Sequence, residues 1–393
     1  MRQSLLLEFP VEEYQKRLNK LIKQMNIKGV NAVILTSDEN TYYFSGFKSI
    51  VWASKVSTPG VLVITKDGDM MIASSKNGRE TVRVTSCVED IRYYGKDSPY
   101  DKYVNAILSI LKEKKLLKGK IGLELGVGHK MHLNHYDRED LFKELSHENS
   151  EIFDAAEILW EVRMIKSELE IEKLRTCCKI NSEAIEKGLR TVKAGTTELE
   201  LYRSILQEYF HLGAEFALPI GVRAGKERYS QGNCPPSSRP IGRGDIILVD
   251  GGPVYKGYYS DIIREAVIGN PTNYQLEMFN TAREACYVGI EKIKPGVPIN
   301  EVCQAVDDYM DRSKFVHINV YKNWCGHSIG VGVHELPMID INTTISLQPG
   351  MVFAIEPYIF EEGVGSLGIE ENVLVTEKGY EILSTSNSEL MIL

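Results

Sequence analysis

Two aspartates near the middle of the chain flank a predicted hairpin and are spaced to bind a metal ion. Two mostly apolar runs, residues 246–249 and 262–267, enclose a segment rich in glycine and proline, which predicts two strands joined by a turn near residues 254–257. If the hairpin is symmetric about that turn, Asp250 and Asp261 lie opposite each other, with Cβ atoms roughly 5 Å apart on one sheet face. Two such carboxylates repel unless a cation separates them. The pair therefore indicates either half of a metal site or two turn residues on a solvated surface.

Further acidic and imidazole side chains follow in the C-terminal part of the chain. His327 and His334 lie in a glycine-rich stretch, where the backbone can approach a ligand closely. Glu356 follows the apolar run 351–355, and a carboxylate at the end of a buried strand is costly unless it is paired. Glu370 begins the last predicted strand. A salt bridge explains any one of these residues, but it does not explain all of them together with the aspartate pair.

The length and composition of the chain limit the class of protein. Its 393 residues exceed what one core usually organises, so we expect two domains. A net charge of −8 without a basic stripe argues against nucleic acid, and no apolar run reaches the ~18 residues of a membrane span. The seven cysteines form no C-x-x-C pair and no signal peptide is evident, so we expect free thiols and a cytoplasmic location.

Alternating helix and strand patterns cover about the first 155 residues and predict a small α/β domain. Apolar residues at helical spacing between Tyr14 and Met25, followed by Gly29, predict one helix. Residues 40–47 are aromatic and rich in turn formers. A second helix is expected around residues 103–111, and strands are expected at residues 32–35, 60–65, 69–73 and 120–123, with a hairpin turn at residues 66–68.

Three histidines at three-residue spacing, His129, His132 and His135, raise a second metal hypothesis. Gly126 and Gly128 precede them and disfavour a regular helix, and no carboxylate recurs at ligand spacing. We therefore interpret this segment as a polar surface loop. Cys325 is similarly assigned to packing, because no general base with an orienting partner is identifiable for a cysteine nucleophile.

The second part of the chain begins with two helix starts and then repeats itself. Ser167 with Glu170, and Thr197 with Glu200, form capping boxes ahead of two amphipathic helices. A strand is expected at residues 216–222. The pattern Lys-Ala-Gly at 193–195 recurs as Lys-Pro-Gly 101 residues later (from 193 to 294). Such a duplication predicts two equivalent halves, each with a long helix, a short helix and strands, that pack their sheets together under the helices with a cleft between them.

Six short segments occur in an order and spacing that is specific for one family: Val249-Asp250-Gly251-Gly252, Gly257-Tyr258-Tyr259-Ser260-Asp261, Gly326-His327-Ser328-Ile329-Gly330, Val333-His334-Glu335, Ile355-Glu356-Pro357 and Gly368-Ile369-Glu370-Glu371. They resemble the pita-bread metallopeptidases, which include methionine aminopeptidases, aminopeptidase P, Xaa-Pro dipeptidases (prolidases) and creatinase. Residues 42–47 and 163–167 extend the resemblance to the N-terminal domain and domain junction of the prolidase and creatinase branch. The resemblance implies a creatinase/prolidase-like α/β domain over residues 1–157. It also implies an α+β pita-bread catalytic domain, with pseudo-two-fold duplication, over residues 158–393.

The resemblance also implies a dinuclear metal-dependent hydrolase of the Xaa-Pro dipeptidase or aminopeptidase type. Asp261 and Glu370 would bridge the two ions, His334 would contact substrate and Glu356 would shuttle a proton. Oxygen-rich ligation with one imidazole suits Mn, Co, Zn or Fe. Two ions roughly 3.5–4 Å apart can acidify a bridging water, and the hydroxide then attacks an amide carbon. The implied metal ligands are Asp250, Asp261, His327, Glu356 and Glu370.

Two positions depart from the proline-specific branch of this family. Asn233 stands where those enzymes carry a histidine, and Gly368 stands where they carry an arginine. Asn233 can donate and accept hydrogen bonds to a substrate, but it cannot exchange a proton near neutral pH. We therefore expect that the protein is not an efficient, proline-specific dipeptidase, and that it acts on another amide or amidine, or on peptides with relaxed specificity. A displaced positive charge could come from Arg223, Arg228, Arg239 or Arg264.

Two other classes of function stay open at this point. One is a creatinase-like enzyme acting on a small amide or amidine, and the other is a non-catalytic binding protein on the same fold. Relatives that lose catalysis usually lose metal ligands, and this chain keeps all five. The resemblance further implies a homodimer. The apolar cluster of Phe47, Ile50, Val51 and Trp52 predicts a lid or an interface patch, unless Trp52 is simply part of the core.

Overall fold

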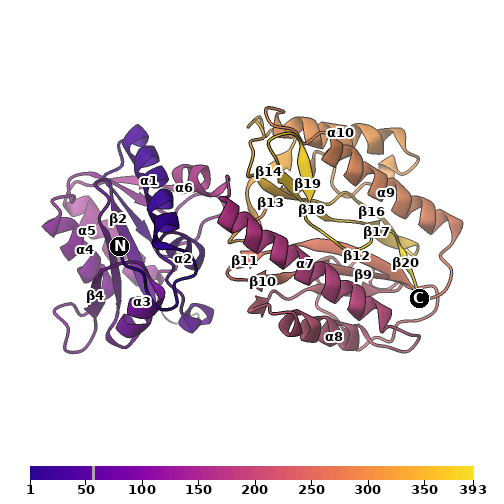
Figure 1. Ribbon diagram of the computed structural model, residues 1–393, viewed down its shortest axis with the longest axis horizontal. Helices are drawn as coiled ribbons and strands as arrows, with labels where there is room; N and C mark the ends of the chain where they lie inside the picture. Colours follow the sequence, from indigo (N-terminus) through magenta and orange to yellow (C-terminus); the bar gives the residue numbers. More distant parts are fainter. Residues whose placement is uncertain (55–57) are drawn as a thin grey trace. The chain divides into compact units, whose positions relative to one another are not determined.

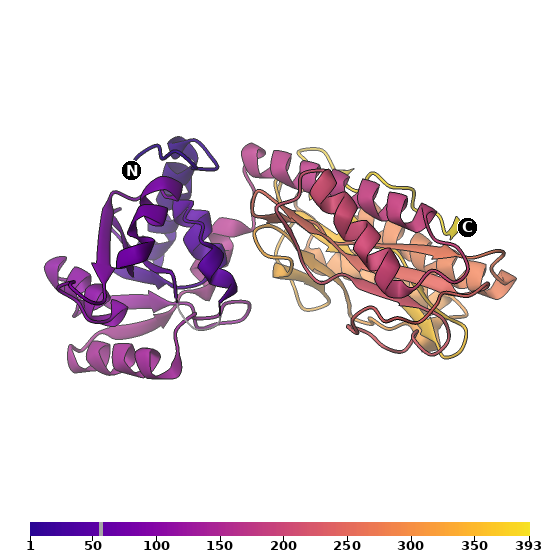
Figure 2. The same ribbon diagram turned by 90° about the horizontal axis from the view of Figure 1, so that it is seen from below.

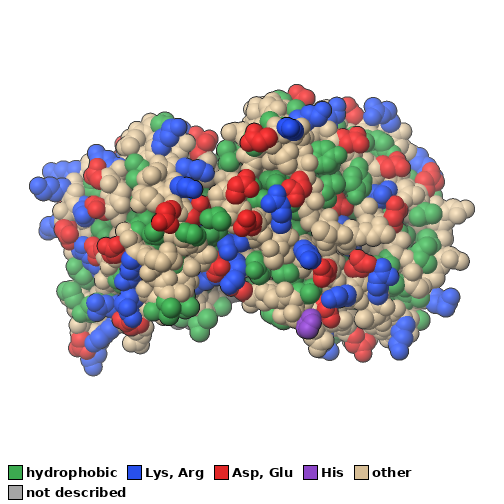
Figure 3. All heavy atoms as spheres, in the orientation of Figure 1, with side chains coloured by type: hydrophobic (Ala, Val, Ile, Leu, Met, Phe, Trp, Pro, Cys, Tyr) green, Lys and Arg blue, Asp and Glu red, His purple; other side chains and the backbone are tan. Residues whose placement is uncertain are grey.

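A computed structural model of the protein describes residues 1–54 and 58–393. The chain forms two compact units, Met1–Arg163 and Met164–Leu393. In the described ranges, no helix combines the length and apolar character that crossing a membrane requires. Acidic and basic side chains are interspersed over the face of the molecule seen in Figure 3.

The N-terminal unit is built around one six-stranded sheet of mixed direction (Figure 1). In the strand order β4-β3-β2-β1-β5-β6, the pairs β1–β2 and β2–β3 are antiparallel and the other neighbours are parallel. The strands are β1 (Ala32–Leu35), β2 (Gly60–Thr65), β3 (Met70–Ser75), β4 (Asp90–Tyr94), β5 (Lys120–Leu123) and β6 (Glu151–Asp154). The α-helices are α1 (Val11–Lys28), α2 (Asp38–Ser45), α3 (Arg79–Thr85), α4 (Tyr103–Glu113), α5 (His135–His147) and α6 (Ala156–Arg163), and the 3-10 helices are η1 (Ile50–Ala53) and η2 (Lys76–Gly78).

Most of the expected elements of this unit are confirmed, but residues 40–47 differ from the expectation. The α1 helix ends at Gly29 with φ 67°, and the hairpin between β2 and β3 forms as predicted. The aromatic segment is mostly helical, since Ser37 caps α2 by accepting a hydrogen bond from the Asn40 N–H and Gly46 ends the helix at φ 78°. Its aromatic side chains are buried. Burial of these rings therefore outweighs the turn propensity of the segment.

The C-terminal unit contains two helix pairs and two principal sheets. In Figures 1 and 2 the helices lie on the outer side of the strands, with α7–α8 on one side and α9–α10 on the other. The sheets have the orders β20-β12-β9-β8 and β14-β13-β15-β18-β19, beside the smaller sheets β11-β10-β7 and β16-β17. The helices are α7 (Glu168–Arg190), α8 (Glu198–His211), α9 (Asn273–Glu291), α10 (Ile299–Arg312) and the 3-10 helix η3 (Val316–Ile318). The strands are β7 (Phe216–Ala217), β8 (Gly221–Ala224), β9 (Ile246–Gly251), β10 (Pro253–Tyr255), β11 (Tyr258–Tyr259), β12 (Ile262–Val267), β13 (Trp324–Ser328), β14 (Glu335–Asp340), β15 (Val352–Ile355), β16 (Tyr358–Glu361), β17 (Gly365–Gly368), β18 (Glu371–Val375), β19 (Tyr380–Ile382) and β20 (Met391–Ile392).

The predicted duplication is confirmed, and it extends to single packing contacts. Both predicted capping boxes form, at the starts of α7 and α8. A Cβ atom at Gly188 of α7 would lie 2.4 Å from Ile205 of α8, and one at Gly289 of α9 would lie 2.7 Å from Val306 of α10. The two pairs are separated by the same 101 residues (188 to 289 and 205 to 306). Each half thus brings its two helices together over a glycine.

The central hairpin forms, but its register differs from the prediction. The turn is Lys256-Gly257, where both residues have positive φ (53° and 78°), as a two-residue type I′ turn requires. The pairing that follows places Asp250 opposite Ile263, so Asp250 and Asp261 are not directly opposite as predicted. The shift is two residues, and two is the side-chain period of a strand. Both aspartates therefore still face the same side of the sheet.

The strand expected at residues 216–222 is broken into two. β7 ends at Ala217 and β8 begins at Gly221. Pro219 lies between them and has no backbone N–H to donate to a neighbouring strand. The break places β8 in the sheet with β9, directly beside Asp250.

Candidate metal centre

The first half of the C-terminal unit contributes two carboxylates to one point. Asp250 lies near the end of β9, opposite Gly221 of β8, and Asp261 immediately precedes β12. Ligand atoms of Asp250, Asp261 and Glu370 all lie within 4.8 Å of one another. Glu370 belongs to the second half and immediately precedes β18. Asp261 and Glu370 thus occupy equivalent positions, each directly before one of the duplicated strands β12 and β18.

The second half adds an imidazole and one more carboxylate. His327 lies in β13, and Glu356 immediately follows β15. The Nε2 atom of His327 is 3.3 Å from Oε1 of Glu356 and 3.9 Å from Oε1 of Glu370. Ligand atoms of these three residues also lie within 4.8 Å of one another. The structure therefore brings together all five residues that the sequence singled out as metal ligands.

The tautomer of His327 suits a metal ligand. Its Nδ1 atom is 3.1 Å from the backbone oxygen of Ser328, which can only accept a hydrogen bond. The Nδ1 atom therefore carries the proton, and Nε2 presents its lone pair to the carboxylates. A histidine that binds a metal is commonly oriented in this way by a carbonyl group.

Several buried polar atoms of this cluster have no hydrogen-bond partner among the residues that the structure describes. They are Oδ1 of Asp261, Nε2 of His327 and both carboxylate oxygens of Glu370. Buried polar atoms without a partner are rare, and here four of them belong to residues of overlapping groups whose potential ligand atoms lie within 4.8 Å of one another. A divalent cation supplies the missing interaction for all of them, so the donor set fits a metal centre.

The electrostatics of the cluster also favour a bound cation. Burial raises the pKa of Asp261 and of Glu370 well above the usual range, and neighbouring carboxylates add to the effect. Burial likewise raises the pKa of Glu356. Burial lowers the pKa of His327 to about 4, so its imidazole is neutral at physiological pH. Without a cation the cluster retains protons, and a bound cation would displace them.

Asn372 holds the two halves of the cluster together, although none of the sequence motifs pointed to it. Its side-chain oxygen accepts hydrogen bonds from the backbone N–H of Asp261 (3.1 Å) and from the Ser260 hydroxyl (2.9 Å). Its side-chain nitrogen donates to the backbone oxygen of Asp261. Asn372 lies two residues after Glu370, so this buried amide fixes the position of one bridging candidate relative to the other. Its place directly after the pair Glu370-Glu371 was the only sequence signal for this role.

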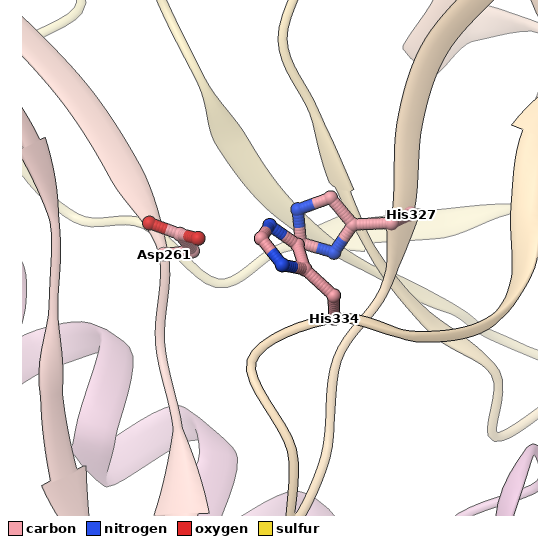
Figure 4. A group of neighbouring side chains, drawn as sticks. All are labelled: Asp261, His327 and His334. Carbon is pink, nitrogen blue, oxygen red and sulfur yellow. The ribbon is translucent and has the colours of Figure 1, made fainter. Parts of the chain in front are cut away.

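His334 lies at the exposed side of the cluster. Its ring is 4.2 Å from the His327 ring, centroid to centroid, at an interplanar angle of 81°. Figure 4 shows Asp261 on one side and the imidazoles of His327 and His334 on the other, with the three side chains directed toward a shared space. One ligand atom from each of these three residues lies within 4.8 Å of the others. Burial also lowers the pKa of His334 to about 4, so this ring is neutral and can donate a hydrogen bond.

The cluster opens into a cavity of about 800 Å³, large enough for a small-molecule substrate. Asn233 lines this cavity, as predicted for a residue that contacts substrate, and it adopts a left-handed conformation (φ 58°) that asparagine tolerates well. Tyr321 and Trp324 form part of an aromatic wall, with ring centroids 4.8 Å apart. Arg223 also lines the cavity.

The two sites that the sequence analysis set aside remain outside the cluster. His129 stacks on Trp160 with ring centroids 4.4 Å apart, and His135 is exposed near Glu139. Over the described part of the chain, none of the three N-terminal histidines belongs to a group of potential metal ligands. The loop interpretation is only partly correct, because His129 is half-buried and His135 begins helix α5. Cys325 is buried, and its thiol pKa is raised by a hydrogen bond with Cys303 and by burial, which agrees with a packing role.

Comparison with known proteins agrees with this fold. The family described as metallopeptidase family M24 matches residues 172–377, which is more than half of the chain, and the creatinase/prolidase N-terminal domain matches residues 17–165. The protein has the pita-bread fold, and the chain belongs to metallopeptidase family M24 as a hydrolase of that family.

Relatives and solved structures match the chain over nearly its whole length. A protein of Staphylococcus aureus named as an uncharacterized peptidase is 28% identical over 370 residues, covering 94% of this chain and 98% of the relative. An Xaa-Pro dipeptidase from Bacillus anthracis has a TM-score of 0.83 at 25% identity, covering 97% of this chain and 100% of the other. A prolidase from Pyrococcus horikoshii has a TM-score of 0.80 at 25% identity, covering 96% and 100% of the two chains.

Proposed function

We propose that this protein is a dinuclear metal-dependent hydrolase that cleaves the amide bond of dipeptides or of compounds of similar size. The observation that carries the proposal is the buried group of ligand atoms without hydrogen-bond partners around Asp261 and Glu370. The dipeptidase and prolidase to which the chain is similar support a dipeptide-sized substrate. The proposed metal ligands are Asp250, Asp261, His327, Glu356 and Glu370.

The proposed mechanism divides the chemistry between the cations and the chain. When bound, two divalent ions would supply a Lewis acid and an acidified water. Glu356 is half-buried at the cavity wall, where it can take a proton from the nucleophile and return it to the leaving amine. His334 lines the cavity and is neutral at physiological pH, and in this proposal it would donate a hydrogen bond to the substrate carbonyl. Asn233 also lines the cavity and would orient the substrate by its amide group.

Metal analysis of the purified protein tests the first part of this proposal. After incubation with Mn, Co, Zn or Fe and removal of the excess, we expect close to two ions per chain. Asp250→Ala should remove bound metal and activity together, whereas Asp308→Ala, at an exposed position of α10, should leave both unchanged. Fewer than about one ion per chain, or an active Asp250→Ala protein, would contradict the proposed site.

The substrate shell argues against efficient, proline-specific cleavage. The arginine of the proline-specific enzymes is replaced by Gly368, where a Cβ atom would lie 2.7 Å from the backbone oxygen of Pro357. No larger side chain fits there without moving the backbone at Pro357, directly before β16. Loss of one desolvated charged contact typically costs about 2–5 kcal/mol. We therefore propose relaxed peptide specificity, or action on another small amide or amidine.

A hydrolysis screen with Mn-, Co- and Zn-loaded protein tests the substrate class. It should contain Xaa-Pro dipeptides, other dipeptides, creatine and cyclic amidines, so that the creatinase-like alternative is tested as well. A kcat/KM for Xaa-Pro dipeptides of roughly 10⁴ M⁻¹s⁻¹ or more, with all other substrates far behind, would contradict relaxed specificity. Metal binding without any hydrolysis would favour a binding protein on the same fold.

We further propose that the protein is a cytoplasmic homodimer. All seven cysteines are free thiols, which suits a reducing compartment. The 3-10 helix η1 exposes apolar side chains, with Ile50 at 95% and Val51 at 39% exposure, as a subunit interface would require. Trp52 is half-buried and packs against Phe47 and His132, so this ring belongs partly to the core.

A further inference from the structure

Arg223 lies in a small chamber that opens from the main cavity. The chamber has a volume of about 180 Å³ and is lined by Arg223 and by the phenol rings of Tyr229, Tyr321 and Tyr358. Asp250 and Glu356 line both the chamber and the main cavity. A substrate group that enters this chamber therefore stays beside the proposed metal ligands.

The guanidinium group of Arg223 makes few direct contacts with the described protein groups. Its Nη2 atom donates one hydrogen bond, of 3.3 Å, to the hydroxyl of Tyr358. Among the residues that the structure describes, no carboxylate forms an ion pair with Arg223. Since the side chain is 7% exposed overall, this is a buried cation with most of its five N–H donors available to the chamber. A buried charge without a partner is costly unless a ligand completes it.

The other three arginines considered as sources of a displaced charge are already paired. Arg228 binds Glu198, with Nε 3.1 Å from Oε1, and Arg239 binds Asp245 at 2.7 Å. Arg264 binds Glu371 at 2.8 Å and donates to the backbone oxygen of Glu370. Of these four arginines, only Arg223 lines the cavity.

The register of the duplicated strands places Arg223 beside the ligand cluster. In the second half, His327 pairs with Ala354, two residues before Glu356. In the first half, Arg223 pairs with Leu248, two residues before Asp250.

Arg223 and His327 therefore occupy equivalent positions of β8 and β13. Because the side-chain period of a strand is two, Arg223 and Asp250 face the same side of the sheet as diagonal neighbours, with Cα atoms roughly 7–8 Å apart. Since Asp250 and Glu356 line both the chamber and the main cavity, a carboxylate bound by Arg223 would lie within one or two amino-acid residues, at about 3.3–3.6 Å each, of the proposed metal ligands.

Arg223 also reaches toward the site of the missing arginine. Gly368 of β17 pairs with Tyr358 of β16, whose hydroxyl accepts the hydrogen bond from Arg223. A side chain cannot leave Gly368 on this side, because the backbone of Pro357 and Tyr358 is too close. Arg223 of β8 therefore supplies a positive charge near the position where Gly368 of β17 has no side chain.

We propose that Arg223 anchors a carboxylate of the substrate, so that this enzyme acts on small amides that carry a carboxylate one or two residues from the reacting bond. This proposal adds a substrate class to the proposed function, and it rests on the proposed function for the nature of the reacting bond. The planar guanidinium group matches both oxygens of a carboxylate, and Tyr229, Tyr321 and Tyr358 line the chamber around it.

Arg223 also acts on the protein's own acids, and this role has to be separated from substrate binding. Burial raises the pKa of Asp250, and the positive charge of Arg223 opposes that rise. Glu265 is buried nearby, accepts a hydrogen bond from the Gly368 N–H (3.2 Å), and is influenced by Arg223 in the same way. If charge balance were the only role of Arg223, its removal would weaken metal binding but would not change the preference for anionic ligands.

The first experiment measures binding of a matched pair of probes to the metal-loaded protein. N-acetyl-L-alanine carries the carboxylate, and N-acetyl-L-alaninamide has the same shape without the charge. We expect the wild-type protein to bind the carboxylate probe at least about 10-fold more tightly. Arg223→Met should abolish this preference, and Arg223→Lys should restore part of it. Lys226→Met removes an exposed cation of the neighbouring loop and should leave the preference unchanged.

Metal content is measured for each variant, so that the two roles are distinguished. Equal affinity of the wild-type protein for both probes, or an unchanged preference in folded Arg223→Met, would overturn the inference. If Arg223→Met does not fold, butanedione modification of the wild-type protein replaces it. Arg223 should then be protected by N-acetyl-L-alanine and not by the amide, and equal protection would overturn the inference. These readouts need no turnover, so a protein that prefers the carboxylate probe but hydrolyses nothing contradicts only the proposed function.

Discussion

At the residue scale, the predicted metal centre is a group of like charges that the metal-free protein must accommodate. Burial and the neighbouring carboxylates raise the pKa of Glu370 in the folded protein. The folded state then binds more protons than the unfolded state above the ordinary glutamate pKa of about 4.3, so its stability falls as the pH rises. The pKa values of His327 and His334 are lowered in the folded protein instead. These two residues therefore change the stability only below about pH 6.5, where the imidazoles of the unfolded chain are protonated.

This sign gives a prediction for Glu370→Gln. In the presence of a chelator, the free energy of unfolding of the wild-type protein should fall as the pH rises above about 6.5, where the two histidines no longer contribute. The fall should be shallower in Glu370→Gln, by up to about 1.4 kcal/mol per pH unit, because one titrating carboxylate is gone. Urea unfolding at several pH values measures both slopes. Added Mn²⁺ should remove the fall in the wild-type protein, since ligands bind metal in their deprotonated form. Equal slopes in the two chelated proteins would show that Glu370 does not titrate in this range.

Gly368 carries a second prediction at this scale. Its Cβ position is 2.7 Å from the backbone oxygen of Pro357, and its N–H donates to Glu265. Gly368→Arg, the apparent reversion to a proline-specific enzyme, should therefore lower the free energy of unfolding by about 1–3 kcal/mol through overpacking. It should not raise kcat/KM for Xaa-Pro dipeptides. Gly379→Arg is the matched control, because no atom lies within 4 Å of the Cβ position there. A stable and more active Gly368→Arg protein would refute the argument.

At the element scale, the duplicated helix pairs determine how the strands that carry the ligands are held. Gly289 allows α9 to approach α10 so closely that a Cβ atom would lie 2.7 Å from Val306 Cγ2. Alanine at an open helical position is about 1 kcal/mol more favourable than glycine. At Gly289 the contact is with a stiff β-branched side chain, which cannot move aside without shifting the helix.

We therefore predict that Gly289→Ala lowers the free energy of unfolding by about 1–2 kcal/mol, against the helix propensity. Gly188→Ala should behave in the same way, because its Cβ would lie 2.4 Å from Ile205 Cγ1. Urea unfolding of Gly289→Ala, Val306→Ala and the double variant measures the coupling. The double variant should be more stable than the sum of the single effects predicts. Additive effects would mean that the two side chains do not meet.

The elements also show which parts of the architecture the sequence determines. Strands at residues 32–35 and 120–123, and the capping boxes of α7 and α8, follow from local patterns that the fold does not override. The hairpin register was mispredicted because Lys256, a residue without a glycine's freedom, takes a positive φ in the turn. That choice depends on the flanking strands, and the residue types alone do not reveal it.

Some residues of the site are identifiable from sequence motifs, and others only from their contacts in the folded chain. Residues of unusual type at fixed spacing, such as Asp250 and His327, were identifiable from the sequence, and the fold brings them together. Arg223 was one of four candidate arginines, and contacts in the folded chain single it out, because the other three are paired and only Arg223 of the four lines the cavity. The role of Asn372 depends on contacts with residues more than 100 positions away (372 to 261), which no local pattern encodes.

At the scale of the whole molecule, the proposed chemistry belongs to one of the two units. All five proposed metal ligands, together with His334, Asn233 and Arg223, lie in Met164–Leu393. The N-terminal unit has its own sheet and core. It contributes no group of potential metal ligands among the residues that the structure describes. On this N-terminal unit, the 3-10 helix η1 presents an apolar surface formed by Ile50 and Val51.

The homodimer prediction follows from that surface. Ile50 is 95% exposed, and burying such a side chain at an interface is favourable by roughly 1.5–3 kcal/mol. This free energy alone is too small to hold a dimer together, but it contributes when the side chain lies at the centre of a larger interface. Light scattering at micromolar concentration should give about twice the chain mass of 44.3 kDa. Ile50→Asp should shift the protein toward the single-chain mass, whereas Ile27→Asp, at another exposed apolar position, should not. A mass of one chain at all concentrations would reject the dimer, and an unaltered dimer in Ile50→Asp would place the interface elsewhere.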